Sequence, residues 1–236
     1  MGDAVLAIVG DVDPAATAAV LEARLAGLEA AARRAPARLG EPPDWPTRAR
    51  DKVLRREREQ AHLVLGYPGL TLRDPRIDAL EVMNTVLGGQ SGRLFQALRE
   101  EDGLVYQVDA SSTEGLDAGH FAVYAATGQD KVPRALAAIE RHLAEIIAAP
   151  PTEVELERAK AWLIGQHGIG LQRRARIASQ IALSAVIGEA PGHYLDYPQR
   201  IARIRAKDVL EVARAVIVPS RRQMVVVAGR GVALRG

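Results

Sequence analysis

The 236-residue sequence contains no cysteine, which excludes disulfide bonds, thiol catalysis and cysteine-ligated zinc. Aromatic residues make up only 4% of the chain, so the core must be built from leucine, isoleucine, valine and alanine. No apolar run approaches the ~20 residues that a membrane-spanning helix needs, and we expect no membrane partner. The lack of cysteine leaves the compartment open, because a periplasmic protein can also lack it.

Charge is nearly balanced, with a net charge of +2. The isoelectric point is about 9.1, and the excess of base comes mainly from arginine pairs such as Arg55–Arg56, Arg173–Arg174 and Arg221–Arg222. Aromatic residues are scarce and acids lie between the bases, so the pattern argues against a nucleic-acid surface. With 48% hydrophobic and 25% charged residues, the composition is typical of a globular protein with one large domain, or one domain plus a fragment.

The first residues lead directly into an apolar run. Met1-Gly2-Asp3 shows no signal peptide, and the following residues 4–9 are short and rich in β-branched side chains, which predicts a buried strand. We therefore expect that the chain was cut from a longer sequence, and that any targeting segment belongs to the part that is missing. Asp13 is then predicted to cap a helix, with Pro14 at the first helical position and the helix running to about Gly27-Leu28.

A change of composition predicts a linker. Residues 31–52 lack periodicity and contain Pro42-Pro43 and Trp45-Pro46. The sequence is therefore divided into a strand and helix at residues 1–30, a linker at 31–52 and a larger domain at 53–236.

The larger domain alternates short strands and helices. We first predict an edge strand at 53–59, a strand at 62–67, a helix that begins at Asp74-Pro75 and ends at Leu87, and a short helix at 93–101. Two strands at 104–112 and 119–126 are joined by a turn at 114–117. Helices near 131–148, 152–171, 174–187 and 207–216 and a strand at 223–229 complete the domain. The order predicts an α+β fold, a layered sheet of about five to six mostly antiparallel strands covered by helices.

The glycine-rich turn Gly88-Gly89-Gln90-Ser91-Gly92-Arg93 separates two of the predicted helices. Glycines before a helix can bind an anion through free backbone N–H groups. This turn lacks the Gly-Lys-Ser/Thr ending of a phosphate loop and does not follow a strand. The pattern therefore favours a turn that ends one helix and starts the next, with Arg93 as a packing or salt-bridge residue.

Several segments in order resemble one protein family. These are Val9-Gly10-Asp11-Val12-Asp13, Leu87 to Phe95, Leu98-Arg99-Glu100, Gly103-Leu104-Val105-Tyr106 and Phe121 to Thr127. Together they are similar to the non-catalytic second half of pitrilysin-type zinc peptidases, which include the mitochondrial processing peptidases. The resemblance implies a half with the LuxS/pitrilysin-like metallopeptidase fold, preceded at residues 1–30 by the last strand and helix of a catalytic-type domain.

Catalysis in this family uses His-x-x-Glu-His on a helix, where both histidines bind zinc and the glutamate acts as base. The sequence has five histidines and none has a histidine partner three to five residues away. The nearest approach is His142-Leu143-Ala144-Glu145-Ile146, with Ile146 in the place of the second ligand, and it is interpreted as a solvated polar stripe. The resemblance therefore implies no cofactor in this chain and zinc in a separate catalytic half.

The same resemblance assigns substrate-binding residues. The family places an arginine and a tyrosine seven positions apart, and Arg99 and Tyr106 match in type and spacing. A guanidinium suits peptide carbonyls, and a phenol can donate to an oxyanion. Gln90 and Ser91 are expected to line the substrate chamber. The alternative is structural: Arg99 pairs with neighbouring acids, and Tyr106 is a half-buried strand residue.

These patterns leave two functions open. The first is a catalytically inactive, substrate-binding domain whose partners are an extended peptide and a catalytic zinc-binding half, in the same polypeptide or in a sister subunit. The second is a non-proteolytic structural or assembly subunit of the same fold. Residues 4–9, if separated from their sheet, are expected to dock elsewhere or to pair with a second molecule as a dimer. For a bacterial protein the periplasm is favoured over the cytoplasm.

Overall fold

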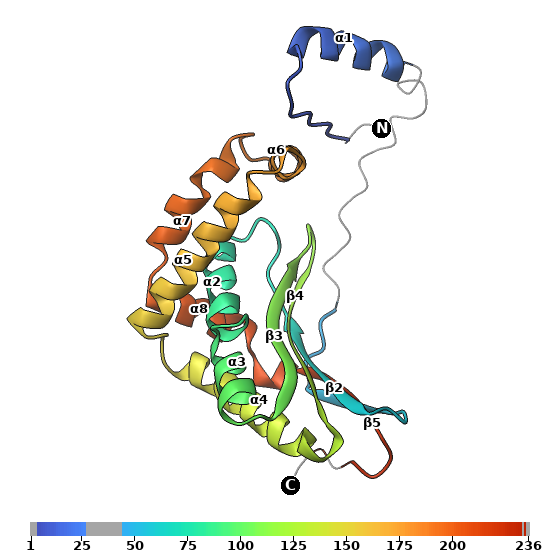
Figure 1. The fold of residues 1–236 in the computed structure, drawn as a ribbon, viewed down its shortest axis with the longest axis vertical. Helices are drawn as coiled ribbons and strands as arrows, with labels where there is room; N and C mark the ends of the chain where they lie inside the picture. Colours follow the sequence, from blue (N-terminus) through green and yellow to red (C-terminus); the bar gives the residue numbers. More distant parts are fainter. Residues whose placement is uncertain (1–3, 27–43, 233, 235–236) are drawn as a thin grey trace. The chain divides into compact units, whose positions relative to one another are not determined.

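The computed structural model describes residues 4–26, 44–232 and 234 of the chain (Figure 1). It divides the chain into two compact units. The first combines residues 1–41 with 164–199, and the second combines 42–163 with 200–236. The predicted division at residues 30 and 52 stays a prediction, and most of the predicted linker lies outside the described residues.

The second unit is built on one five-stranded sheet. Its strands are β1 (Arg50–Arg55), β2 (Gln60–Pro68), β3 (Val105–Glu114), β4 (Gly119–Gly128) and β5 (Gln223–Ala228). They lie in the order β1-β5-β2-β4-β3, with β1 parallel to β5 and all other neighbours antiparallel. The predicted α+β class and the mostly antiparallel sheet are confirmed.

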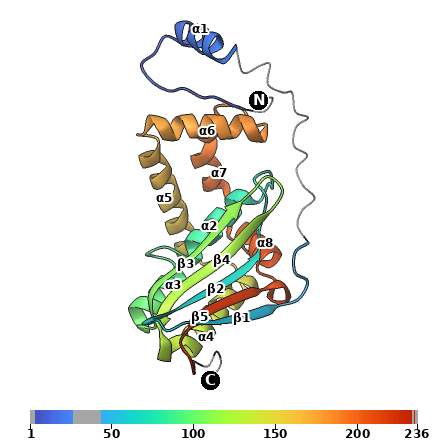
Figure 2. The same cartoon turned by 90° about the vertical axis from the view of Figure 1, so that its right-hand side faces the viewer.

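Helices of the second unit cover one face of this sheet, and Figure 2 shows the other face turned toward the viewer. The helices of the described residues are α1 (Pro14–Leu25), α2 (Ile77–Leu87), α3 (Arg93–Phe95), α4 (Val132–Ala148), α5 (Glu153–Gly170), α6 (Arg174–Ile187), α7 (Tyr197–Arg203) and α8 (Ala206–Val216). Short helical segments are η2 (Gln96–Glu101), η3 (Gln129–Lys131), η4 (His193–Asp196) and η5 (Pro219–Arg221).

The core lies between the sheet and the helices of the second unit. Along β2, Ala61, Leu63, Leu65 and Tyr67 are buried while the residues between them are more exposed, as expected for a sheet covered on one face. Phe121 on β4 is fully buried and its ring centroid lies 6.1 Å from that of Tyr67. The other buried side chains are mostly leucine, valine, isoleucine and alanine, as the shortage of aromatic residues predicted.

Local capping explains where two helices begin. Asp13 accepts a hydrogen bond from the backbone N–H of Ala16 at 2.6 Å, which confirms it as the cap of α1. Before α5, the backbone N–H of Thr152 donates to Glu155 Oε2 at 2.8 Å and the N–H of Glu155 donates to Thr152 Oγ1 at 3.3 Å. These reciprocal bonds form a capping box.

Three sequence predictions need correction. Residues 4–9 form no strand, because a strand requires a paired neighbour and the sheet of the described residues contains only the five strands above. Helix α2 begins at Ile77, and Asp74 binds the backbone and side chain of Arg76 instead of capping the helix. The edge strand spans 50–55 rather than 53–59, because its register is set by pairing with β5.

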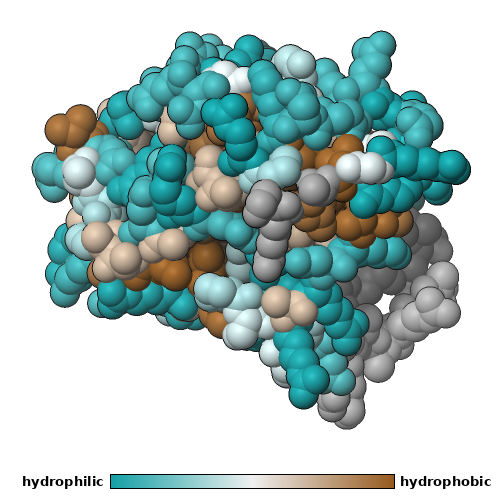
Figure 3. Space-filling model, turned by 90° about the horizontal axis from the view of Figure 1, so that it is seen from below, coloured by the Kyte–Doolittle hydropathy of each residue, from teal (hydrophilic) through white to brown (hydrophobic). Residues whose placement is uncertain are grey.

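The first unit contains α1, the end of α5, α6, η4 and the start of α7. The sequence did not predict α7. Within the described residues, no helix combines the length and apolar character that spanning a bilayer requires. Seen from below, hydrophilic side chains cover most of the surface, with smaller hydrophobic patches between them (Figure 3).

Candidate functional site

Glycines shape the turn between α2 and α3. Gly88 ends α2, and Gly89 has a φ of 69°, a left-handed conformation that favours glycine. A Cβ on Gly92 would lie 1.8 Å from the carbonyl oxygen of Gly88, so no larger residue fits there. The glycines are explained by this sharp change of direction between two helices, the interpretation that the sequence favoured over a phosphate loop.

Gln90 and Ser91 lie at the tip of this turn. The Gln90 side chain is exposed, and its backbone carbonyl accepts a hydrogen bond from Gln96 Nε2 at 2.9 Å. Ser91 is partly exposed and lines an open cavity of about 470 Å³. The two predicted chamber residues therefore lie side by side, and the cavity involves Ser91 but not Gln90.

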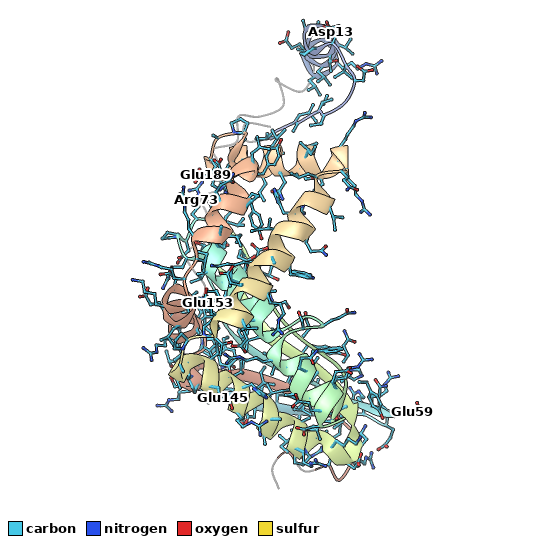
Figure 4. All side chains as sticks on the ribbon, turned by 60° about the vertical axis from the view of Figure 1, so that its left-hand side comes forward. Asp13, Glu59, Arg73, Glu145, Glu153 and Glu189 are labelled. Carbon is cyan, nitrogen blue, oxygen red and sulfur yellow. The ribbon has the colours of Figure 1, made fainter. Side chains whose placement is uncertain are left out.

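Charged side chains from four segments surround this cavity. Its lining residues are Ser91, Arg93, Gln96, Ala97, Glu101, His142, Glu145, Thr152, Glu155 and Arg158. Figure 4 shows Glu145, a lining residue on α4, and Glu153 at the start of α5, the helix that also carries the lining residues Glu155 and Arg158. The lining contains both acidic and basic side chains, so its charge favours neither an anionic nor a cationic ligand.

Arg93 joins the glycine turn to α5. Its Nε lies 2.5 Å from Glu155 Oε1 and its Nη2 lies 2.9 Å from Glu155 Oε2, a bidentate pair. Hydrogen bonds from Arg93, helped by those of Thr152, lower the pKa of Glu155 to about 2. Arg93 is thus a salt-bridge residue, as the sequence suggested, and the pair holds the turn against the start of α5.

Arg99 lies in a π-helix. The six residues of η2 directly follow α3, and Leu98 anchors this segment in the core. Arg99 points outward, with its side chain 47% exposed. Its guanidinium carbon lies 5.1 Å from the centroid of the Phe95 ring, and Nε lies 4.0 Å from Glu100 Oε1. The pair with Glu100 is the kind of contact that the structural alternative expected for Arg99, and at this distance and exposure it contributes little to stability.

Tyr106 lies at an irregularity in β3. Val105 pairs with Thr127 and Gln107 pairs with Ala126, so Tyr106 is the extra residue of a β-bulge. Both Tyr106 and Gln107 are exposed, while Val105 and Val108 are buried. Tyr106 is 57% exposed, so a little under half of its surface is covered, and the alternative of a half-buried strand residue stays open beside the ligand role.

The structure separates the four predicted residues into two neighbouring groups. Gln90 and Ser91 belong to the turn before α3, whereas Arg99 and Tyr106 lie on either side of the turn at 102–104. Within the described residues, no hydrogen bond joins Arg99 to Tyr106. Each presents a long polar side chain to solvent from an irregular stretch of backbone.

The residues near His142 do not form a metal site. Its side chain is 13% exposed and Nδ1 lies 2.9 Å from Glu145 Oε2, so within the predicted solvated polar stripe the histidine is the less solvated member. Helix α4 packs its neighbour Ile146 into the core, where it is fully buried and offers no ligand atom. Across the described ranges, no group of three or more histidine, cysteine, aspartate or glutamate side chains could hold a metal ion.

Sequence reasoning missed two residues that support the turn at 102–104. Thr127 Oγ1 donates to the carbonyl oxygen of Leu104 at 2.6 Å, and Lys131 Nζ donates to that of Gly103 at 2.9 Å. Nothing in the local sequence indicates these contacts, because the partners are more than twenty residues apart. A polar threonine at the end of the otherwise apolar strand 121–127 was the one hint that this side chain has a buried hydrogen-bond partner.

Solved structures of similar fold include a protease from Helicobacter pylori. That structure has a TM-score of 0.84 and is 21% identical to this chain over 93% of this chain and 53% of its own. The peptidase M16 inactive domain from Pseudomonas fluorescens gives a TM-score of 0.75 at 22% identity, covering 83% of this chain and 47% of that structure. At such identities the likeness establishes the fold.

Similar sequences include two bacterial zinc proteases named as uncharacterized. The one from Streptomyces coelicolor is 36% identical over 169 residues, or 71% of this chain and 37% of the relative. The one from Bacillus subtilis is 38% identical over 119 residues, or 50% of this chain and 29% of the relative. The chain therefore spans well under half the length of these relatives.

The model of the peptidase M16 inactive domain matches residues 2–163, about two thirds of the sequence. The matched part includes the glycine turn, η2, the bulged start of β3 and the first half of α5. The resemblance drawn from the sequence is thus confirmed, and the chain belongs to the peptidase M16 inactive domain family.

Proposed function

We propose that this chain is the substrate-binding, catalytically inactive half of a zinc metallopeptidase. In this proposal an extended peptide lies against the surface that carries Arg99 and Tyr106. A separate catalytic half, in the same polypeptide or in a sister subunit, holds the zinc ion and the general base. Its zinc supplies the activated water for peptide hydrolysis.

One observation carries the proposal: Arg99 and Tyr106 are both exposed on irregular backbone. π-Helices and β-bulges occur often at functional sites, because they redirect a side chain that a regular element would place elsewhere. A tyrosine that is 57% exposed also gives up hydrophobic stabilisation that burial in the sheet would provide. A ligand bound at this surface would account for the exposure.

The chemistry of the two side chains suits a peptide backbone. The guanidinium of Arg99 has several N–H donors in a fixed plane, and these match carbonyl oxygens of an extended chain. The phenol of Tyr106 can donate to the carbonyl oxygen that becomes negatively charged when water attacks. Arg99 therefore positions the peptide, and Tyr106 stabilises charge on the bond that the catalytic half cleaves.

The test uses the protein that contains both halves, with dye-labelled casein as an unfolded substrate. Tyr106→Phe keeps the ring and removes the hydroxyl, and we expect kcat to fall by about a hundredfold, as for loss of an oxyanion donor. Arg99→Ala is expected to raise KM as well. Gln107→Ala alters the exposed neighbour on the same bulge and serves as the matched control. Unchanged turnover in Tyr106→Phe would disprove the assigned role.

A further inference from the structure

The segment between Arg99 and Tyr106 is short and held at several points. It contains Asp102, Gly103 and Leu104, and Gly103 has a φ of 57°. The backbone N–H of Asp102 donates to Ala97 O at 3.0 Å, and the N–H of Leu104 donates to Leu98 O at 2.7 Å. These bonds tie the segment back to η2, but they leave the carbonyls of Gly103 and Leu104 to other partners.

Side chains from the end of β4 and from η3 bind both carbonyls. Thr127 Oγ1 donates to Leu104 O at 2.6 Å, and Lys131 Nζ donates to Gly103 O at 2.9 Å. Thr127 is also the register partner of Val105, the residue immediately before the bulge. One threonine therefore contacts the segment by its side chain and the start of β3 by its backbone.

Thr127 is fully buried, so its hydroxyl needs a hydrogen-bond partner within the protein, and Leu104 O is that partner. Its exposed fraction is 0%, and Phe121, Val123 and Ala125 on the same face of β4 are also fully buried. A hydroxyl in such surroundings costs free energy unless it is hydrogen-bonded, and valine would otherwise be the natural residue at this position. The bond to Leu104 is therefore the reason for a polar residue here.

We propose that Thr127 is a positioning residue, which fixes the separation and direction of Arg99 and Tyr106 for peptide binding, and that Lys131 assists it from the solvent side. The inference rests on the proposed function. Thr127 does not touch the peptide. It acts by preventing the 102–104 segment from shifting, and a misplacement of about 1 Å can cost up to a hundredfold in rate.

The test compares Thr127→Val, which keeps the shape and removes the hydroxyl, with Thr127→Ser, which keeps the hydroxyl. The readouts are amide hydrogen exchange of residues 102–107 and the KM and kcat of the two-half protein on labelled casein. We expect Thr127→Val to speed exchange and to raise KM by about tenfold, on the scale of a sub-ångström misplacement. Thr127→Ser should restore both values, and Lys131→Met should show a smaller effect in the same direction.

Folding and function are separated by the accompanying measurements. Thermal unfolding of each variant shows that measurements are made on folded protein. Unchanged exchange in Thr127→Val would overturn the inference. Faster exchange with an unchanged KM in Thr127→Val would also overturn the inference, provided that Arg99→Ala and Tyr106→Phe both impair activity. If neither Arg99→Ala nor Tyr106→Phe has any effect, the proposed function itself fails and the positioning role falls with it.

Discussion

The two units of the chain differ in how far they bury their apolar side chains. In the described residues, every buried apolar side chain lies between Ala61 and Leu163 or between Ile201 and Ala228, in the second unit. In the first unit, Leu183 is 41% exposed and Leu195 is 57% exposed, and Ser184 is the one buried residue of its described part. The difference shows that the stability of the described chain comes from the second unit.

The largest effect is expected from a cavity in the core of the second unit. Phe121→Ala removes a fully buried ring that packs against Tyr67, and we expect the free energy of unfolding to fall by about 3–5 kcal/mol. Chemical denaturation monitored by circular dichroism measures the loss. The exposed neighbour His120→Ala is the control and should change little. A loss below about 1 kcal/mol for Phe121→Ala would mean that the side chains around Phe121 are not the main source of stability.

An intermediate effect is expected from the ion pair between Arg93 and Glu155. The pKa of Glu155 is lowered to about 2 from an ordinary value of 4.5, so the pair stabilises the fold fully above about pH 4.5. This contribution is lost as the pH falls from about 4.5 to about 2. Because the pair is partly solvated, we expect Glu155→Gln to cost only about 1–2 kcal/mol at neutral pH.

The pH dependence provides the specific measurement for this pair. The stability difference between the wild-type chain and Glu155→Gln should shrink as the pH falls from 4.5 toward 2. Glu153→Gln changes an exposed acid in the first turn of the same helix and is the matched control. A difference that stays constant across this range would show that the ion pair does not stabilise the fold.

The smallest effect is expected in the first unit. Leu183→Ser changes an exposed side chain on α6, and we expect the free energy of unfolding to change by no more than about 0.5 kcal/mol. Hydrogen exchange should also show α6 opening before the strands of the second unit. A loss of several kcal/mol in Leu183→Ser would remove the contrast between the two units.

Features with a local cause were predictable from the sequence. The cap at Asp13, the capping box at Thr152 and the glycine turn after α2 each depend on a few consecutive residues, and the structure contains all three. The strand predicted at 62–67 likewise lies within β2. The types and the order of most elements follow from such patterns, and with them the α+β class.

Features that depend on distant residues were not predictable. The register of β1 is set by β5, more than 160 residues later. Residues 4–9 resemble a strand, but they pair with no strand of the part of the chain that the structure describes. The family resemblance marked Arg99 and Tyr106, which match its arginine and tyrosine in type and spacing. It gave no sign of the π-helix or of the bulge, which is defined by the pairing of β3 with the distant strand β4. Their role as ligand contacts stays a prediction.

The π-helix and the bulge also bear on how this surface tolerates changes of chain length. Each element contains one residue more than its regular counterpart. Deletion of a single residue from 96–101 would leave an ordinary α-helix and rotate the direction of Arg99 by about 100° relative to the following turn. Deletion of Tyr106 would leave a regular strand. Each deletion would therefore preserve a well-formed element while it redirects Arg99 or removes Tyr106, so proteins that lack one of these residues are expected to fold and to lose this surface.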